Sequence, residues 1–236
     1  MTTPSTHTHL LQVCRTCGGG APVDVHFCPS CTKIMTLGRQ GDYFSFLGLP
    51  RKLDLDVASL EQRFRALSRQ FHPDFYYNAT PTERRASLER ASYLNDAYRT
   101  LKQPSSRVAY LLEIEGVLKM SDQEAGKKVP ASLLEEVFAL NEELDEVRDA
   151  RAAGLTDEEW RARLDKAAAP IEARRAEHDS QVRALSVRWD ALTETDEQGR
   201  REVLAALRDR VLERNYINNL LATIEREATG QGGPHL

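Results

Sequence analysis

The chain has 236 residues, of which 41% are hydrophobic and 29% are charged, a composition typical of a soluble globular protein with much exposed helical surface. The formal net charge is only -4, so no global basic field exists that would hold nucleic acid or an anionic membrane. No apolar run approaches the roughly 20 residues that a membrane-spanning helix needs.

The residue pattern predicts three parts, a linker and a tail. Residues 1–40 are rich in cysteine, glycine and proline, and residues 41–117 carry helical periodicity. Residues 118–130 mix glycine, serine and lysine and end in proline, which is typical of a linker. Residues 131–229 are helical again, and residues 230–236 are expected to form a disordered tail. Because no β-rich stretch occurs outside the first segment, the expected fold class is all-α.

All four cysteines lie in the first segment and form two Cys-x-x-Cys pairs: Cys14 and Cys17, then Cys28 and Cys31. Two such pairs can bring four thiolates to the corners of a tetrahedron, and Gly18 allows the left-handed turn that points backbone N–H groups at sulfur. This pattern predicts a structural Zn²⁺ site in a small zinc-ribbon-like segment, which has too little core to fold alone. A redox dithiol and an accidental cluster are the alternatives, and His26 is a possible substitute ligand.

Two long helices are predicted in the middle part. The first begins at the cap residue Asp56, and its apolar residues recur at spacings of three and four: Val57, Leu60, Phe64, Leu67 and Phe71. It must stop before Pro73, because proline disfavours helical backbone for the residue before it. The second begins at Thr80-Pro81 and ends before Pro104, and its apolar face is formed by Leu88, Ala91, Leu94, Tyr98 and Leu101. The two helices form a hairpin whose loop contains His72-Pro73-Asp74.

Three helical segments are predicted in the C-terminal part, at about 131–152, 156–191 and 199–228. The first keeps a heptad-like apolar spacing, which is enough for one buried seam: Leu133, Val137, Leu140, Leu144 and Val147. An antiparallel three-helix bundle is the simplest arrangement of these segments.

Two apolar residues of the first of these segments, Leu134 and Phe138, lie one step around the helix from the seam. Glu142 and Glu146 follow them on the same stripe. Apolar residues outside a complete seam, flanked by acids, indicate a protein-binding patch. The alternative is a wider core face, because core stripes are often broader than a strict seam.

The His72-Pro73-Asp74 tripeptide alone indicates little more than a helix stop with a capping aspartate. A catalytic His–Asp pair would need a nucleophile, and no such constellation accompanies it. Its place between two long helices, however, resembles the J domain, which contacts DnaK-class chaperones and stimulates their ATP hydrolysis. The resemblance implies that basic residues of the first hairpin helix also contact the chaperone, and the matching candidates are Arg63, Arg65 and Arg69. The chain departs from the commonest J-domain pattern at Phe75, where a lysine is frequent.

Within J proteins the chain is similar to the HscB family over about residues 40 to 228. The matching stretches are Asp42 to Pro50, Leu101 to Leu112 and Asn141 to Glu146. The cysteine segment resembles the N-terminal extension of eukaryotic-type members. The resemblance implies that the bundle binds an IscU-type iron–sulfur scaffold protein, with contacts at Leu134, Phe138, Glu142, Glu146 and Tyr216. At Ala139 the family can carry a glutamate, so we expect one polar contact fewer here.

The resulting hypothesis is a co-chaperone, not an enzyme, that holds the scaffold while its J domain docks on an HscA/DnaK-class ATPase. A J protein for another client, a zinc-ribbon nucleic-acid protein and a dithiol oxidoreductase are the alternatives. The cysteine segment contains only Arg15, Lys33 and Arg39, too few for a phosphate footprint. Residues 1–13 contain no lysine or arginine, which argues against a secretory or organellar leader. We therefore expect the bacterial cytoplasm, or the mitochondrial matrix if the organism is a eukaryote.

Overall fold

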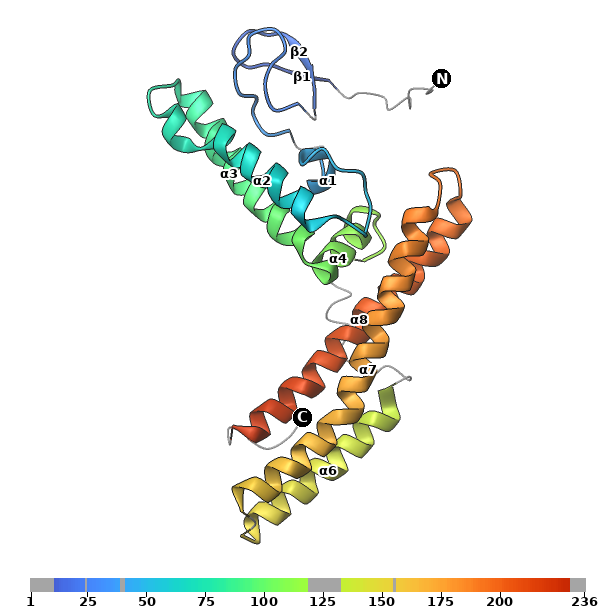
Figure 1. Ribbon diagram of the computed structural model, residues 1–236. Coiled ribbons are helices and arrows are strands. Elements are labelled where there is room, and N and C mark those ends of the chain that lie inside the picture. The colour runs from blue at the N-terminus through green and yellow to red at the C-terminus, as the bar shows by residue number, and fades with distance from the viewer. Residues whose placement is uncertain (1–10, 24, 39–40, 119–132, 155, 230–236) are drawn as a thin grey trace. The chain divides into compact units, whose positions relative to one another are not determined.

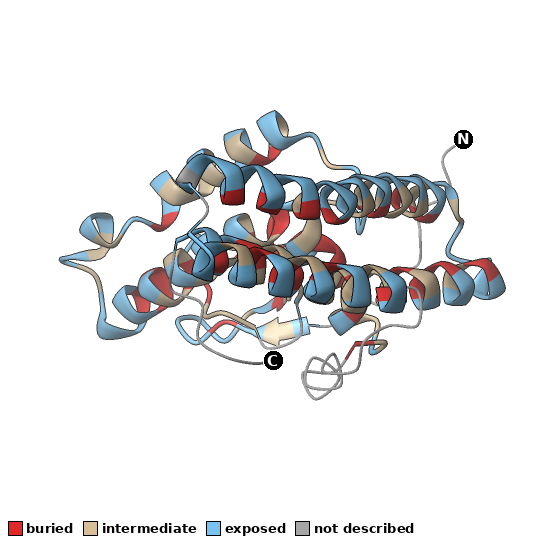
Figure 2. Ribbon diagram, turned by 90° about the horizontal axis from the view of Figure 1, so that it is seen from below, coloured by how far each residue is buried: buried red, intermediate tan, exposed pale blue. Residues whose placement is uncertain are grey.

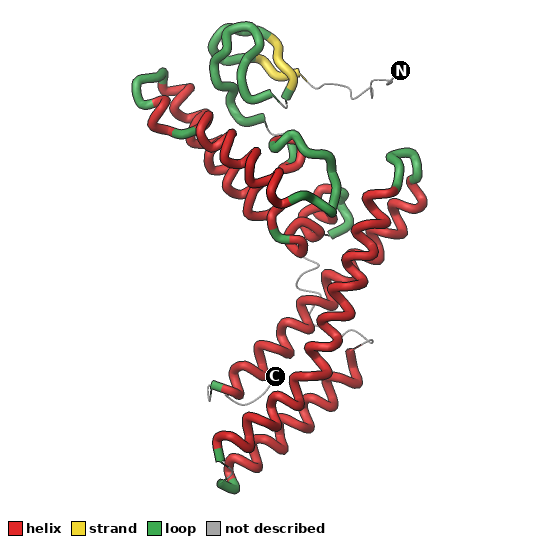
Figure 3. The backbone as a smooth tube through the Cα atoms, viewed as in Figure 1, coloured by secondary structure: helices red, strands yellow, loops and turns green. Residues whose placement is uncertain are grey.

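The computed structural model describes residues 11–23, 25–38, 41–118, 133–154 and 156–229. The predicted tail and all but the first residue of the predicted linker lie outside the described residues. Besides one two-stranded sheet, the regular elements of the described residues are helices, which confirms the all-α fold class (Figure 3). Within the same residues no helix combines the length and the apolar character that crossing a bilayer requires.

The chain divides into two compact units, residues 1–111 and 112–236, each with its own buried residues. The first unit begins with strands β1 (Leu11–Val13) and β2 (Gly20–Pro22), which pair antiparallel in the small cysteine segment (Figure 1). The core of this segment is minimal, and its buried members are Cys14, Ala21, Cys28 and Met35.

The helical hairpin of the first unit consists of α2 (Val57–Phe71) and α3 (Pro81–Lys102). The single turn η1 (Pro73–Tyr76) joins them, and α1 (Tyr43–Phe46) and α4 (Pro104–Ile114) flank them. The predicted caps are confirmed. Asp56 accepts from the first backbone N–H groups of α2, and Thr80 forms a reciprocal capping box with Glu83 at the start of α3.

The predicted apolar faces of the two long helices are wrong at two positions. Leu88 is 58% exposed and Val57 is 40% exposed. In the first half of α3 the buried face is instead rotated toward Ser87 and Arg90. Hydrophobic periodicity treats these two polar residues as outward-facing, but their polar groups are hydrogen-bonded inside the unit, so they can be buried at low cost.

The second unit contains α6 (Leu134–Ala152), α7 (Asp157–Ala191) and α8 (Glu197–Ala228). Helices α7 and α8 form a long antiparallel hairpin, and α6 packs along one part of α7 (Figure 1). The predicted seam is confirmed, because Leu133, Leu140, Leu144 and Val147 are buried in one core cluster and Val137 packs against it. Figure 2 shows how the buried residues form stripes along the helices.

The seam makes a testable prediction with a matched control on the same helix. Leu144→Ala removes a side chain that is 2% exposed, and the cavity should lower the free energy of unfolding by about 2–5 kcal/mol. Leu134→Ala removes the same atoms from a side chain that is 40% exposed, and should cost less than about 1 kcal/mol. Chemical denaturation measures both, and equal losses would contradict the placement of Leu134 outside the core.

Candidate functional site: a four-cysteine cluster and an exposed His-Pro-Asp turn

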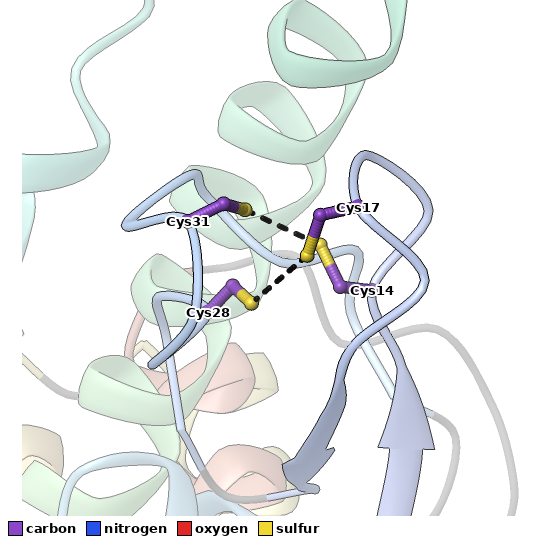
Figure 4. Close-up of side chains that lie close together, drawn as sticks. All are labelled: Cys14, Cys17, Cys28 and Cys31. Carbon is purple, nitrogen blue, oxygen red and sulfur yellow. Dashed lines mark hydrogen bonds between the residues drawn. The ribbon is translucent and has the colours of Figure 1, made fainter.

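The four cysteines lie in two equivalent backbone turns (Figure 4). In the first turn the N–H of Gly18 donates to the carbonyl of Cys14 at 2.8 Å, and in the second the N–H of Thr32 donates to that of Cys28 at 2.8 Å. The residue that closes each turn has positive φ, 75° at Gly18 and 59° at Thr32. The prediction for Gly18 is confirmed. Thr32 was missed, because a threonine rarely adopts this conformation and only the matching position after Cys31 indicates it.

The sulfur positions fit a tetrahedral metal site. All four Sγ atoms lie within 4.8 Å of one another, and the Cys14–Cys31 and Cys17–Cys28 pairs are each 3.7 Å apart. A tetrahedral zinc ion with Zn–S bonds of about 2.3 Å requires sulfurs about 3.8 Å apart, whereas a disulfide requires about 2.05 Å. Among the described residues, the group of side chains close enough to share a metal ion consists of these four cysteines, so His26 is not brought into the site as a substitute.

The thiols differ in their readiness to ionise. The N–H groups of Cys17 and Thr16 lower the pKa of Cys14 to about 6, and the N–H of Cys31 lowers the pKa of Cys28. The N–H of Lys33 favours the thiolate of Cys31, but burial and the neighbouring sulfurs outweigh it and raise its pKa to about 12. Four adjacent thiolates repel one another, so a bound cation is needed to hold all of them ionised.

The His72-Pro73-Asp74 tripeptide forms a well-anchored turn with exposed side chains. His72 ends α2 and its Nδ1 accepts from the N–H of Asp74 at 3.3 Å. The side chains of His72 and Asp74 are 52% and 86% exposed. Below them the hydroxyl of Ser87 donates to the carbonyl of Phe71 at 2.7 Å. The turn therefore presents a polar surface from a fixed backbone.

The three predicted basic residues on α2 are all exposed but have different surroundings. Arg63 donates to the carbonyls of Leu47 and Gly48 at 3.1 and 3.0 Å, which ties α2 to the end of α1. Arg65 pairs with Glu61 on its own helix. Arg69 lies in the last turn of α2, one turn before the tripeptide. This part of α2 therefore presents positive charge beside the turn.

The predicted patch on α6 is solvent-exposed in its first four members. Phe138 is 71% exposed and Leu134 is 40% exposed, so neither is part of a wider core face. Glu142 and Glu146 are exposed farther along the helix. The fifth predicted residue, Tyr216 on α8, is half-buried against the bundle core, and this burial raises its pKa. Tyr216 is therefore less available to a partner than the α6 residues.

One residue at the site was missed by the sequence analysis. Arg90 of α3 is only 2% exposed and its guanidinium bonds to the cysteine segment. An arginine in a helix is normally read as a solvated residue. The sequence indication would have been its position, one turn after Ala86 and one turn before Leu94, both of which are buried.

No protein-family model matches the chain. It is 32% identical over 171 residues to the co-chaperone protein HscB of Proteus mirabilis, across 72% of this chain and 93% of that protein. It is 34% identical over 144 residues to the human iron–sulfur cluster co-chaperone protein HscB, across 59% of this chain and 60% of that protein.

Two solved structures are similar to this one. The crystal structure of human co-chaperone protein HscB has a TM-score of 0.64 at 23% identity, across 92% of this chain and 98% of that chain. Chaperone HscB from Vibrio cholerae has a TM-score of 0.60 at 27% identity, across 81% of this chain and 100% of that chain.

A helical hairpin that exposes a His-Pro-Asp turn, in a chain with a separate three-helix bundle, defines a J-domain co-chaperone. The similarity to the Proteus mirabilis protein extends over most of both chains, and it identifies one family within the J-domain co-chaperones. The chain belongs to the HscB family.

The cysteine cluster makes a prediction that is independent of any partner. The wild-type chain should bind one Zn²⁺ and, when reconstituted with Co²⁺, show a thiolate-to-metal absorption band. Cys28→Ser removes one ligand and should abolish stoichiometric binding, whereas Ser30→Ala in the same turn should retain it. Elemental analysis and absorption spectra measure both variants. A wild-type chain with no such band would contradict the metal site.

Proposed function

We propose that this chain is a co-chaperone of iron–sulfur cluster assembly that binds an IscU-type scaffold protein and stimulates an HscA/DnaK-class ATPase. The observation that carries the proposal is the exposed His72–Asp74 turn beside the basic surface of α2. The printed names of the matched proteins, which include an iron–sulfur cluster co-chaperone, support the process. In this proposal residues 41–117 serve the ATPase, and residues 131–229 serve the scaffold.

The proposed ATPase contact uses charge and rigidity together. Arg65 and Arg69 present cationic groups that would steer and hold an acidic chaperone surface. Arg63 donates to the carbonyls at the end of α1, so its positive charge is held in a defined position. The imidazole and carboxylate of the turn then offer specific hydrogen bonds at the end of this surface. Because the turn is already ordered, little conformational entropy is lost when the chaperone binds.

The proposed scaffold contact is a stripe on α6 with residues four apart. Leu134 and Phe138 provide an apolar half, and Glu142 and Glu146 provide an acidic half. Exposing the phenylalanine ring to water is unfavourable in the free protein. Covering the ring with a partner removes this apolar surface from water and therefore favours binding. The buried seam beside the stripe packs α6 into the bundle core, so the stripe is presented on a helix that is held in place.

The chain's own residues perform no bond-breaking step in this mechanism. The bundle holds the scaffold, the J domain contacts the ATPase, and the covalent chain between them keeps both partners together. The four cysteines would hold a Zn²⁺ ion whose chemistry is structural, because four thiolates leave no open coordination position. The proposed compartments are the bacterial cytoplasm or, in a eukaryote, the mitochondrial matrix.

His72→Gln should abolish stimulation of the cognate ATPase, because glutamine lacks the ring nitrogen that caps the turn and cannot present imidazole to the chaperone. Steady-state ATP turnover at saturating co-chaperone measures the effect. Scaffold affinity, measured by calorimetry, should stay at the wild-type value because the bundle is unchanged. Normal stimulation by His72→Gln would overturn the J-domain assignment.

Phe138→Ala should weaken scaffold binding by about 1–3 kcal/mol because it removes the most exposed apolar side chain of the stripe. Val187→Ala on α7 is the matched control, since Val187 is also exposed, at 56%, but lies outside the stripe. This control should change the affinity by less than about 0.5 kcal/mol. Equal affinities for wild type and Phe138→Ala, with ATPase stimulation intact, would point to a different client.

A further inference from the structure

Arg90 joins α3 to the cysteine segment through hydrogen bonds to four residues. Its Nε donates to the carbonyl of Met35 at 2.7 Å, and its Nη1 donates to Nδ1 of His26 at 2.8 Å. Its Nη2 lies 3.3 Å from the carbonyl of Thr36 and 3.4 Å from that of Val25. Every one of these acceptors belongs to the segment that carries the cysteines.

The charge of Arg90 makes these acceptors necessary. Burial lowers the pKa of Arg90 to about 10, so the guanidinium remains protonated at neutral pH although it is only 2% exposed. A buried cation must be surrounded by hydrogen-bond acceptors. An arginine has only donors, so the Nδ1 of His26 must be unprotonated to accept from it. The folded cysteine segment supplies the groups that solvate this charge.

A second contact links the segment to the start of α3. Lys33 forms an ion pair with Glu83 at 3.1 Å, and the Glu83 carboxylate also accepts from the N–H and the hydroxyl of Thr80 at 3.1 and 2.8 Å. The carbonyl of Lys33 accepts from the N–H of Cys28 at 2.9 Å, within the second cysteine turn. The N-terminal cap of α3 is thus linked to the candidate ligand Cys28 through Glu83 and Lys33.

Aromatic contacts reach the residue next to the His-Pro-Asp turn. The ring of His26 packs edge-on against Phe71 with centroids 5.0 Å apart, and the ring of Phe27 lies 6.2 Å from Phe71. Phe71 is fully buried and immediately precedes His72. The side chain that fixes the end of α2 is therefore covered in part by the cysteine segment.

The fold of that segment depends on its cysteines. Two of the four members of its buried core cluster, Cys14 and Cys28, are themselves candidate ligands, and the other two are Ala21 and Met35. Among the described residues of the segment, Ile34 is the one further buried residue. So small a core cannot hold the segment together without a bound metal. Without metal, His26 and the carbonyls that accept from Arg90 lose their fixed positions, and Phe71 loses its cover.

We propose that Arg90 is a positioning residue that couples metal binding by the four cysteines to the order of the His72-Pro73-Asp74 turn. With metal bound, the segment holds Arg90 and covers Phe71, so the turn is presented in one conformation. With metal removed, Arg90 pulls away from its buried site and the end of α2 loosens. Engagement of the ATPase thereby becomes sensitive to metal supply. This inference rests on the metal site of the proposed function.

Hydrogen exchange of residues 71–78 in the whole 236-residue chain tests the coupling. In the wild type, chelation should raise the exchange rate of these amides about tenfold or more, while those of α8 stay unchanged. Arg90→Met should still show the thiolate-to-Co²⁺ band, yet exchange fast at 71–78 whether or not metal is present. Arg90→Lys should restore part of the metal dependence, because lysine keeps the charge but offers fewer donors in a fixed geometry.

Arg85→Met is the matched control, since Arg85 is an exposed arginine on the same helix that pairs with Glu89. It should keep the full metal dependence of the wild type. Wild-type exchange that does not respond to chelation, with the Co²⁺ band present, would overturn the coupling alone. An absent Co²⁺ band would overturn the metal site and the coupling together. If Arg90→Met fails to fold, the graded response of Arg90→Lys carries the test, and a full wild-type dependence in that variant contradicts the proposal.

Discussion

Pro73 forces α2 to end, and the last residue of that helix, Phe71, contacts elements from three parts of the sequence. Ser87 of α3 binds its carbonyl, while His26 of the cysteine segment and Phe46 of α1 contact its ring. A proline can stop a helix anywhere, but these contacts fix where the chain goes next. The residue before the exposed turn is fully buried, and this burial anchors the backbone that enters the turn. Both the chaperone-binding proposal and the metal-coupling proposal depend on that one buried ring.

Two buried arginines of the first unit, Arg90 and Arg107, connect separate segments through hydrogen bonds to backbone carbonyls. Arg90 binds carbonyls of the cysteine segment, and Arg107 of α4 donates to the carbonyls of Leu101 and Leu53. In both cases a cation donates to backbone carbonyls outside regular hydrogen bonding: those bound by Arg90 and that of Leu53 lie in loops, and that of Leu101 lies in the last turn of α3. The charge costs desolvation, and the carbonyls offset it only when each element is in its native place. Such contacts add little to stability beyond apolar packing, but they define which elements meet.

Local rules predict much of this fold from the sequence. Asp56, Thr80 and the prolines mark the helix ends, and the α6 seam follows from strict spacing. The cysteine spacing predicts the sulfur cluster because the turn geometry is local. What local rules miss is burial that depends on a distant partner. Leu88 was expected inside and is exposed, and Arg90 is inside because carbonyls more than fifty residues away accept its hydrogen bonds. The tripeptide's placement is predictable, but its support by the cysteine segment is not.

The proposal that this chain couples a scaffold to an ATPase has one most direct test. Steady-state ATP hydrolysis by the cognate chaperone is measured with the full chain alone, with the IscU-type scaffold alone and with both together. The account predicts that the chain alone stimulates turnover and that the two together stimulate it more than the sum of their separate effects, because one molecule presents both surfaces. Turnover that the chain leaves unchanged, with or without scaffold, would contradict the account.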